Sequence, residues 1–205
     1  MVEPQVRAFV AVALPPEVKA VLGRVLEHFI QAIGQRGVKW VNAEACHITL
    51  KFLGNVPAFR IPELGEALKR AALRAGPFTL SFDSIGAFPS QERPRVVWVG
   101  QTLESQPLML LQQEVEKELA AAAFPPEARR FTSHITLGRV RDHAPPDALA
   151  GLPATMLRGR KLIAPAPTAA IDEVVLFQST LTRAGAIYSP LATATLQGVR
   201  EGQSS

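Results

Sequence analysis

The sequence predicts an α+β fold built on antiparallel sheet, and three observations support this class. Strand-like and helix-like segments are interspersed along the 205 residues. Several strand-like segments alternate apolar and polar residues, which favours antiparallel pairing over a doubly wound parallel sheet. The sequence contains neither a GxGxxG nor a Walker pattern, so it lacks the phosphate loops typical of dinucleotide and ATP enzymes.

Three amphipathic segments predict the main helices. The first covers residues 16–33. It opens with proline, whose missing N–H costs little in a first helical turn, and Gly34 or Gly37 can end it. The other two cover residues 62–75 and 107–123, where apolar residues recur at spacings of three and four.

Eight segments rich in β-branched and aromatic residues predict strands. The first is apolar throughout, so we expect it to be buried on both faces. Glycine and proline in residues 54–57 are expected to end the third strand, residues 143–153 to form a proline-rich loop, and residues 197–205 to form a polar, frayed tail. The predicted strands are residues 7–14, 38–41, 47–53, 78–82, 95–100, 131–140, 174–177 and 187–196.

The composition excludes several classes of protein. With 47% hydrophobic residues and a net charge of +4, the chain is not disordered, and the charge permits an anionic ligand without requiring one. A single cysteine, Cys46, excludes an intrachain disulfide and a thiolate zinc cluster. No signal peptide or membrane-spanning stretch is evident, so the sequence predicts a soluble cytoplasmic protein. We expect residues 1–205 to form one catalytic domain.

One tetrapeptide occurs twice. His47-Ile-Thr-Leu50 recurs as His134-Ile-Thr-Leu137, although the chain has only four histidines. The copies lie 134 − 47 = 87 residues apart, each in a strand-like context. Because successive side chains of a strand point to opposite faces, each histidine shares a face with the threonine two residues later. Two such strands side by side would direct two imidazoles and two hydroxyls into one space.

Paired acid–base catalysis on a phosphodiester suits these four side chains best. A metal site would need carboxylates at ligand spacing beside the motifs, which are missing. A Cys46–His47 dyad fails because strand neighbours point to opposite faces, and a Ser–His–Asp triad would leave one histidine idle. With ordinary pKa values near 6.5, one imidazole can accept a proton while an imidazolium donates one. The threonine hydroxyls can stabilise the phosphate, and neither a metal nor a cofactor is needed.

The chain resembles the two-histidine (2H) phosphoesterases, in particular the 2′-5′ RNA ligase or RNA 2′,3′-cyclic phosphodiesterase branch. The resemblance covers roughly residues 7–196 and rests on the paired motif. The flanking fragments that support it are RAFVAVALPPE, KWV, HITLKFLG, PRVVWVG, FTSHITLGR, LFQSTL and GAIYSPL. It implies a bilobal α+β fold, in which two pseudo-symmetric lobes each contribute one His-x-Thr strand to a central cleft.

The resemblance also implies roles for individual residues. His47 corresponds to the proton donor and His134 to the proton acceptor, while Thr49 and Thr136 correspond to the phosphate-binding threonines. Members of the family open RNA 2′,3′-cyclic phosphate ends to 2′-phosphates, and they can join or split 2′-5′ linkages without ATP. The implied partner is such an RNA end or a small cyclic nucleotide, and we expect a monomer. Ser133 stands where many relatives have proline.

Two further positions follow the motifs. Phe52 and Arg139 each lie five residues after a motif histidine, where relatives often have an aromatic that contacts a base and an arginine near the phosphate. Strict alternation would put both side chains on the core face, unless Gly138 marks a bulge that redirects Arg139. By the same alternation, Lys51 is expected on the histidine face, where it could attract a polyanion together with residues 129–130.

Two alternative functions stay open from the sequence. One is a 2H phosphodiesterase that acts on a small cyclic nucleotide or an ADP-ribose cyclic phosphate. The other is a non-catalytic nucleotide-binding module, although binding alone does not require two titrating groups.

Overall fold

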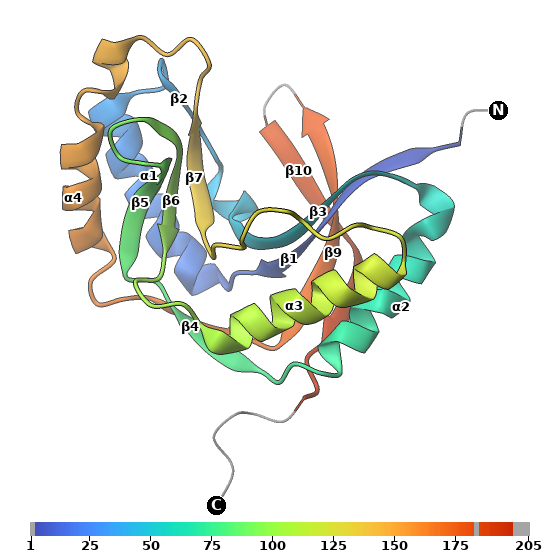
Figure 1. Ribbon diagram of the computed structural model, residues 1–205. Helices are drawn as coiled ribbons and strands as arrows, with labels where there is room; N and C mark the ends of the chain where they lie inside the picture. The colour runs from blue at the N-terminus through green and yellow to red at the C-terminus, as the bar shows by residue number, and fades with distance from the viewer. Residues whose placement is uncertain (1–2, 183–184, 199–205) are drawn as a thin grey trace, which may run out of the picture.

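The fold is a mixed α+β structure with antiparallel sheets, which confirms the predicted class. The computed structural model describes residues 3–182 and 185–198 (Figure 1). Every strand pair within these residues is antiparallel. The helices are α1 (Pro16–Ile33), α2 (Ile61–Ala72), α3 (Gln106–Ala121) and α4 (Leu152–Leu162). The strands are β1 (Gln5–Ala13), β2 (Val38–Trp40), β3 (His47–Pro57), β4 (Phe78–Ser81), β5 (Ser84–Pro89), β6 (Pro94–Gly100), β7 (Ile135–Val140), β8 (Thr168–Ile171), β9 (Glu173–Thr182) and β10 (Gly185–Thr195).

The main sheet is divided into two lobes. Its strand order is β10-β9-β1-β3-β7-β6-β5, and β2 pairs with β7. Between β3 and β7 the described residues give one paired position, Ile48 with Ile135. Lobe 1 therefore consists of β10, β9, β1 and β3, and lobe 2 of β2, β7, β6 and β5; the two lobes diverge from this junction (Figure 1).

The order of elements repeats within the chain. A first half, β1-α1-β3-α2-β4-β5, is followed by a second half, β6-α3-β7-α4-β8-β9. Each half supplies a strand to the other lobe, because β9 pairs with β1 and β5 pairs with β6. The equivalent strands β4 and β8 also pair with each other. Strands β2 and β10 have no counterpart in this repeat, so the two lobes can differ there.

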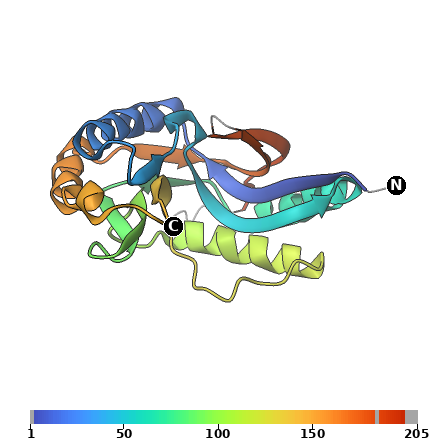
Figure 2. The ribbon, with the colours of Figure 1, turned by 90° about the horizontal axis from the view of Figure 1, so that it is seen from above.

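Helices cover one face of each lobe. Helices α2 and α3 pack against lobe 1, and α1 and α4 pack against lobe 2. Figure 2 shows α1 and α3 on opposite sides of the strands. The buried side of α1 consists of apolar residues at helical spacing. As the sequence predicted, Gly34 ends the helix, with a φ of 72°. The buried residues of α1 are Val18, Leu22, Val25, Leu26 and Phe29.

Several element predictions were incomplete or wrong. The third strand does not end before Gly54: β3 continues to Pro57, because Asn55, Val56 and Pro57 pair with the beginning of β1. Helix α4 covers residues 152–162 and was missed, because a proline and a glycine weaken its helical pattern; it begins inside the predicted loop of residues 143–153. Strands β5 and β8 were also missed, and the strand predicted over residues 131–140 begins only at Ile135. Most of the tail expected at residues 197–205 lies outside the described residues.

Candidate active site

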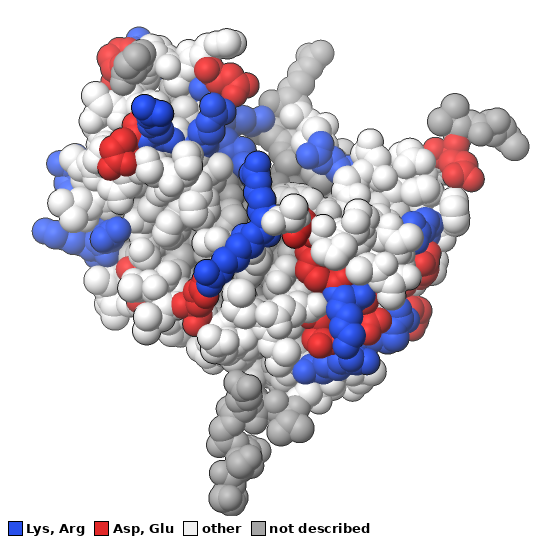
Figure 3. Space-filling model, viewed as in Figure 1, with Lys and Arg blue, Asp and Glu red and all other residues white. Residues whose placement is uncertain are grey.

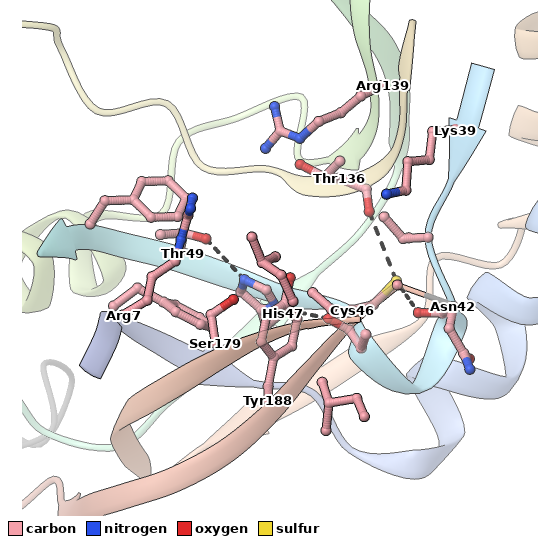
Figure 4. A pocket seen from close by; sticks show the side chains of 18 of the residues that line it. Arg7, Lys39, Asn42, Cys46, His47, Thr49, Thr136, Arg139, Ser179 and Tyr188 are labelled. Carbon is pink, nitrogen blue, oxygen red and sulfur yellow. Dashed lines mark hydrogen bonds between the residues drawn. The ribbon is translucent and has the colours of Figure 1, made fainter. Parts of the chain in front are cut away.

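A pocket of about 850 Å³ lies between the two lobes (Figure 4). Its walls come from β1, β2, β3, β7, β9 and β10, together with residues next to these strands. The structure brings together around it all six residues that the sequence singled out as site candidates: His47, Thr49, Phe52, His134, Thr136 and Arg139.

The two histidines are held in the same way. The Nδ1 atoms of His47 and His134 each lie 2.8 Å from the carbonyl oxygen two residues earlier, which belongs to Ala45 and Thr132 respectively. Because a carbonyl oxygen only accepts, Nδ1 must carry the proton. In the neutral imidazole, Nε2 is then the basic atom. The Nε2 atom of His47 lies 3.0 Å from the Thr49 hydroxyl (Figure 4).

The surroundings of both histidines disfavour the imidazolium form. Burial lowers the pKa of His47 below its ordinary value, and His134, Arg139 and Lys19 lower it further, against the hydrogen bond to Ala45. Burial likewise lowers the pKa of His134, with a smaller contribution from Arg139. Both imidazoles can therefore act as bases near neutral pH, and a bound anion would favour protonation of either one.

The same irregularity occurs in both motif strands. Between β1 and β3, Val10 pairs with Lys51 and Ala11 with Thr49, so Leu50 has no partner. Between β6 and β7, Val97 pairs with Gly138 and Trp98 with Thr136, so Leu137 has no partner. Each of these β-bulges lies at the fourth residue of its His-Ile-Thr-Leu motif, and beyond it the alternation of faces is reversed.

The bulges decide where Phe52 and Arg139 point. Strict alternation would put both side chains in the core, yet Phe52 is 56% exposed, and both line the pocket. For Arg139 this is the redirection that a bulge was expected to cause. Close packing also requires a glycine at position 138, since a Cβ there would lie 2.5 Å from a ring carbon of Trp40.

The expectation for Lys51 was wrong. Because the bulge at Leu50 reverses the alternation, Lys51 points away from the histidines and is only 2% exposed. Its ammonium donates to a carboxylate oxygen of Glu116 at 2.5 Å and to the carbonyl oxygen of Pro125 at 2.8 Å. Lys51 therefore links β3 to α3 inside lobe 1 and is not available to attract a polyanion.

The pocket is positively charged. Arg7, Lys39 and Arg139 line it, and among the described residues its lining includes no aspartate or glutamate. On the face shown in Figure 3, Lys and Arg side chains gather along the hollow between the two lobes. Within the described ranges, no three His, Cys, Asp or Glu side chains cluster as metal ligands would. The chemistry of this lining fits an anion rather than a metal ion.

Cys46 is part of the pocket wall but is not activated. Its Sγ lies 3.8 Å from the carbonyl oxygen of Asn42 and 3.9 Å from that of Thr136 (Figure 4). Burial raises the pKa of the thiol to about 12, so it stays protonated and is a poor nucleophile.

Among the pocket residues that the sequence did not single out are Arg7, Phe9, Lys39 and Tyr188. Phe9 and Tyr188 enclose the His47 ring, with ring centroids 4.8 Å and 5.0 Å away, and Tyr188 presents its edge at 89°. Phe88 makes the corresponding edge contact with His134 at 5.1 Å. Only the alternation within β1 could have indicated that Arg7 and Phe9 share a face.

Comparison with known proteins agrees with this arrangement. The family model described as LigT-like phosphoesterase matches residues 12–98 and again residues 102–188. The chain belongs to the LigT-like phosphoesterase family. Each of the two matches contains one His-x-Thr motif, and together they confirm the resemblance to the 2H phosphoesterases.

Relatives and solved structures of LigT-like phosphoesterases resemble the chain over most of its length. An RNA 2′,3′-cyclic phosphodiesterase of Aeropyrum pernix is 36% identical, over 78% of this chain and 88% of that protein. An RNA 2′,3′-cyclic phosphodiesterase of Thermotoga maritima is 32% identical, over 94% of this chain and 96% of that protein. The crystal structure of Escherichia coli LigT with 3′-AMP has a TM-score of 0.71 and 25% identity over 94% of this chain and 99% of that one. A Thermus thermophilus structure has the same TM-score, with 26% identity over 95% and 100%.

Within the described residues, no helix is long and apolar enough to cross a membrane.

Proposed function

We propose that this LigT-like phosphoesterase hydrolyses RNA 2′,3′-cyclic phosphate ends to 2′-phosphates by two-histidine acid–base catalysis. The observation that carries the proposal is the matched pair of histidines. Each donates its Nδ1 proton to a backbone carbonyl and keeps Nε2 as its reactive atom, in one cationic pocket whose described lining contains no carboxylate. Relatives that match most of the chain are named for this activity.

His134 acts as the base in this proposal. In its neutral form, Nε2 accepts a proton from water, and the water oxygen attacks the phosphorus atom. Within the described part of the chain, no hydrogen-bond partner occupies this Nε2 atom, which leaves it free for a water molecule. The lowered pKa of His134 keeps the imidazole unprotonated near neutral pH.

His47 acts as the acid. As imidazolium, it donates the Nε2 proton to the 3′ oxygen while the bond between phosphorus and that oxygen breaks. The product carries the phosphate on the 2′ oxygen and a 3′ hydroxyl. Burial disfavours the imidazolium of the free enzyme, so the negative charge of the bound phosphate must supply part of its stabilisation.

Thr49, Thr136 and Arg139 hold the phosphate. Each hydroxyl can donate one hydrogen bond to a non-bridging oxygen, where charge accumulates in the transition state. Arg139 adds a positive charge on the lobe 2 side, while Phe52 takes the equivalent position on lobe 1. A base stacked on the exposed ring of Phe52 would orient the terminal nucleotide.

The same groups permit ligation. If a 5′ hydroxyl of a second RNA replaces water, deprotonation by the base and departure of the 3′ oxygen yield a 2′-5′ linkage without ATP. We further propose that the protein acts on RNA as a monomer and that residues 1–205 form a single catalytic domain. We also propose that it is located in the cytoplasm.

The test is an assay with a short RNA that ends in a 2′,3′-cyclic phosphate, in excess EDTA and without ATP. We expect turnover to a 2′-phosphate, identified by chromatography against synthetic 2′- and 3′-phosphate standards. The double variant His47→Ala/His134→Ala is the control for contaminating nucleases. No ring opening, or activity that returns only with an added divalent ion, would contradict the proposal.

A further inference from the structure

Two positively charged residues of the pocket lie directly opposite each other. Lys39 on β2 and Arg139 on β7 are Cα partners in an antiparallel ladder, and both line the pocket. Directly opposite residues share one face of a sheet, with Cβ atoms about 5 Å apart. Figure 4 shows both side chains on the same side of the pocket.

This arrangement is unfavourable without a ligand. Like charges directly opposite each other destabilise a strand pair. No carboxylate within the described part of the chain forms an ion pair with Lys39 or Arg139, whereas the buried Lys51 is paired with Glu116. A pair of cations that no acidic group neutralises is the arrangement expected where a multiply charged anion binds.

The charge of the substrate does not account for both cations. A nucleoside 2′,3′-cyclic phosphate carries one negative charge, while the pocket presents Arg7, Lys39 and Arg139. Each further nucleotide of an RNA end adds one phosphodiester and one negative charge. The excess of positive charge therefore fits an oligonucleotide better than a mononucleotide.

The position of Lys39 is remote from the reacting phosphate. Strand β3 pairs with β7 at Ile135, and β2 takes over the same edge of β7 at Gly138. Arg139 lies three residues beyond Thr136, which corresponds to roughly 10 Å along the strand. Because Lys39 lies directly opposite Arg139, it is displaced from Thr136 by the same distance along the strands.

We propose that Lys39, together with Arg139, binds the phosphodiester that precedes the terminal nucleotide of the RNA. This inference rests on the proposed function and specifies the substrate class: RNA ends of two or more nucleotides, in preference to nucleoside cyclic phosphates. Lobe 1, with Phe52 and Tyr188, then receives the terminal nucleoside, and lobe 2 receives the strand that leads to it.

The experiment compares a nucleoside 2′,3′-cyclic phosphate with a dinucleotide that ends in a 2′,3′-cyclic phosphate. We expect the wild-type protein to show a higher kcat/KM on the dinucleotide, mainly through KM. Lys39→Ala should lower the ratio of the two kcat/KM values roughly 10-fold, the size of one lost charge-assisted hydrogen bond. A dinucleotide whose internal phosphate is an uncharged methylphosphonate should give the same kcat/KM with Lys39→Ala as with the wild type.

The matched control is Lys161→Ala. It removes one exposed positive charge from the end of α4, outside the pocket, and should leave the ratio unchanged. An unchanged ratio in Lys39→Ala would overturn the proposal. If the ratio stayed unchanged because kcat/KM fell equally on both substrates, Lys39 would act on the reacting phosphate instead.

Failure of the proposed function gives a different result. If the wild-type protein opens neither cyclic phosphate, calorimetry with a nucleoside 2′-phosphate and the corresponding dinucleotide 2′-phosphate still measures the subsite. Tighter binding of the dinucleotide that is lost in Lys39→Ala would support the subsite without the activity. Equal binding of both compounds by the wild-type protein would overturn it.

Discussion

Ile48 and Ile135 face each other at the junction between β3 and β7, and each immediately follows a motif histidine. Both isoleucines are fully buried, so this contact belongs to the core that the lobes share. Because it aligns the two copies of the motif, it places His47 and His134 at equivalent positions on either side of the pseudo-twofold axis. The relative position of the two imidazoles is thus supported by packing in the core rather than by contacts between the catalytic groups.

The two histidines should respond differently to the leaving group. His47→Ala and His134→Ala should each lower kcat at least ~10²-fold on a cyclic-phosphate oligonucleotide. If His47 is the acid, a substrate with sulfur in place of the 3′ oxygen should restore much of the activity of His47→Ala, because a thiolate departs without protonation. The same substrate should not restore His134→Ala. Steady-state kinetics on the oxygen and sulfur substrates measure this difference. Rescue of His134→Ala alone would mean that His134 is the acid and His47 the base.

Thr49 and Thr136 should contribute mainly to kcat. Thr→Val keeps the β-branched shape and removes one donor to the phosphate, so kcat should fall on the order of 10²-fold with a smaller change in KM. Thr49→Val should also change the pH dependence, because the hydroxyl lies 3.0 Å from Nε2 of His47. Thermal denaturation provides the control, since neither variant should lose much stability. Wild-type kcat in both variants would mean that the hydroxyls do not contact the phosphate.

The pH dependence should reveal the burial of both imidazoles. Since burial lowers both pKa values, the two limbs of the kcat/KM profile should lie below the ordinary value of about 6.5. The kcat profile should shift to higher pH, because the bound anion favours the imidazolium. Both kcat/KM limbs above pH 7 would contradict the effect of burial.

The aromatic rings next to the histidines should each control one limb of that profile. Tyr188→Ala exposes His47 to water and should raise its pKa, whereas Phe88→Ala should do the same for His134. Each variant is therefore expected to move a different limb upward. Tyr188→Phe keeps the ring and is the matched control, which should leave the limbs in place. Movement of the same limb by both alanine variants would show that the contacts are not specific to one histidine.

Lys51 should matter for stability and not for catalysis. Lys51→Met leaves the carboxylate of Glu116, itself only 15% exposed, without its cation, and should cost about 3 kcal/mol of unfolding free energy. The double variant Lys51→Met/Glu116→Leu should recover much of this loss. Lys69→Met, which breaks an exposed pair with Glu66, should change the unfolding free energy far less than Lys51→Met does. Urea denaturation measures all three, and a lower kcat in Lys51→Met would contradict the assignment of Lys51 to the core.

The sequence by itself determined the local features of this protein. The spacing of apolar residues predicted helices α1, α2 and α3, and the proline and glycine at its ends delimited α1. The alternation within His-Ile-Thr-Leu correctly paired histidine with threonine on one face, and buried Ile48 and Leu50 on the other. These properties depend on neighbours along the chain, which a sequence shows directly. The resemblance of the paired motif added the family.

Only the tertiary structure decided what lies beyond each motif. The bulges at Leu50 and Leu137 arise from pairing with β1 and β6, and they reverse the faces of Lys51, Phe52 and Arg139. The same holds for Lys39, whose position opposite Arg139 depends on the pairing of β2 with β7, and for Tyr188 on β10. Register between strands far apart in the chain is fixed by packing of the whole sheet. A period-two pattern within one strand contains no information about where its partner inserts or omits a residue.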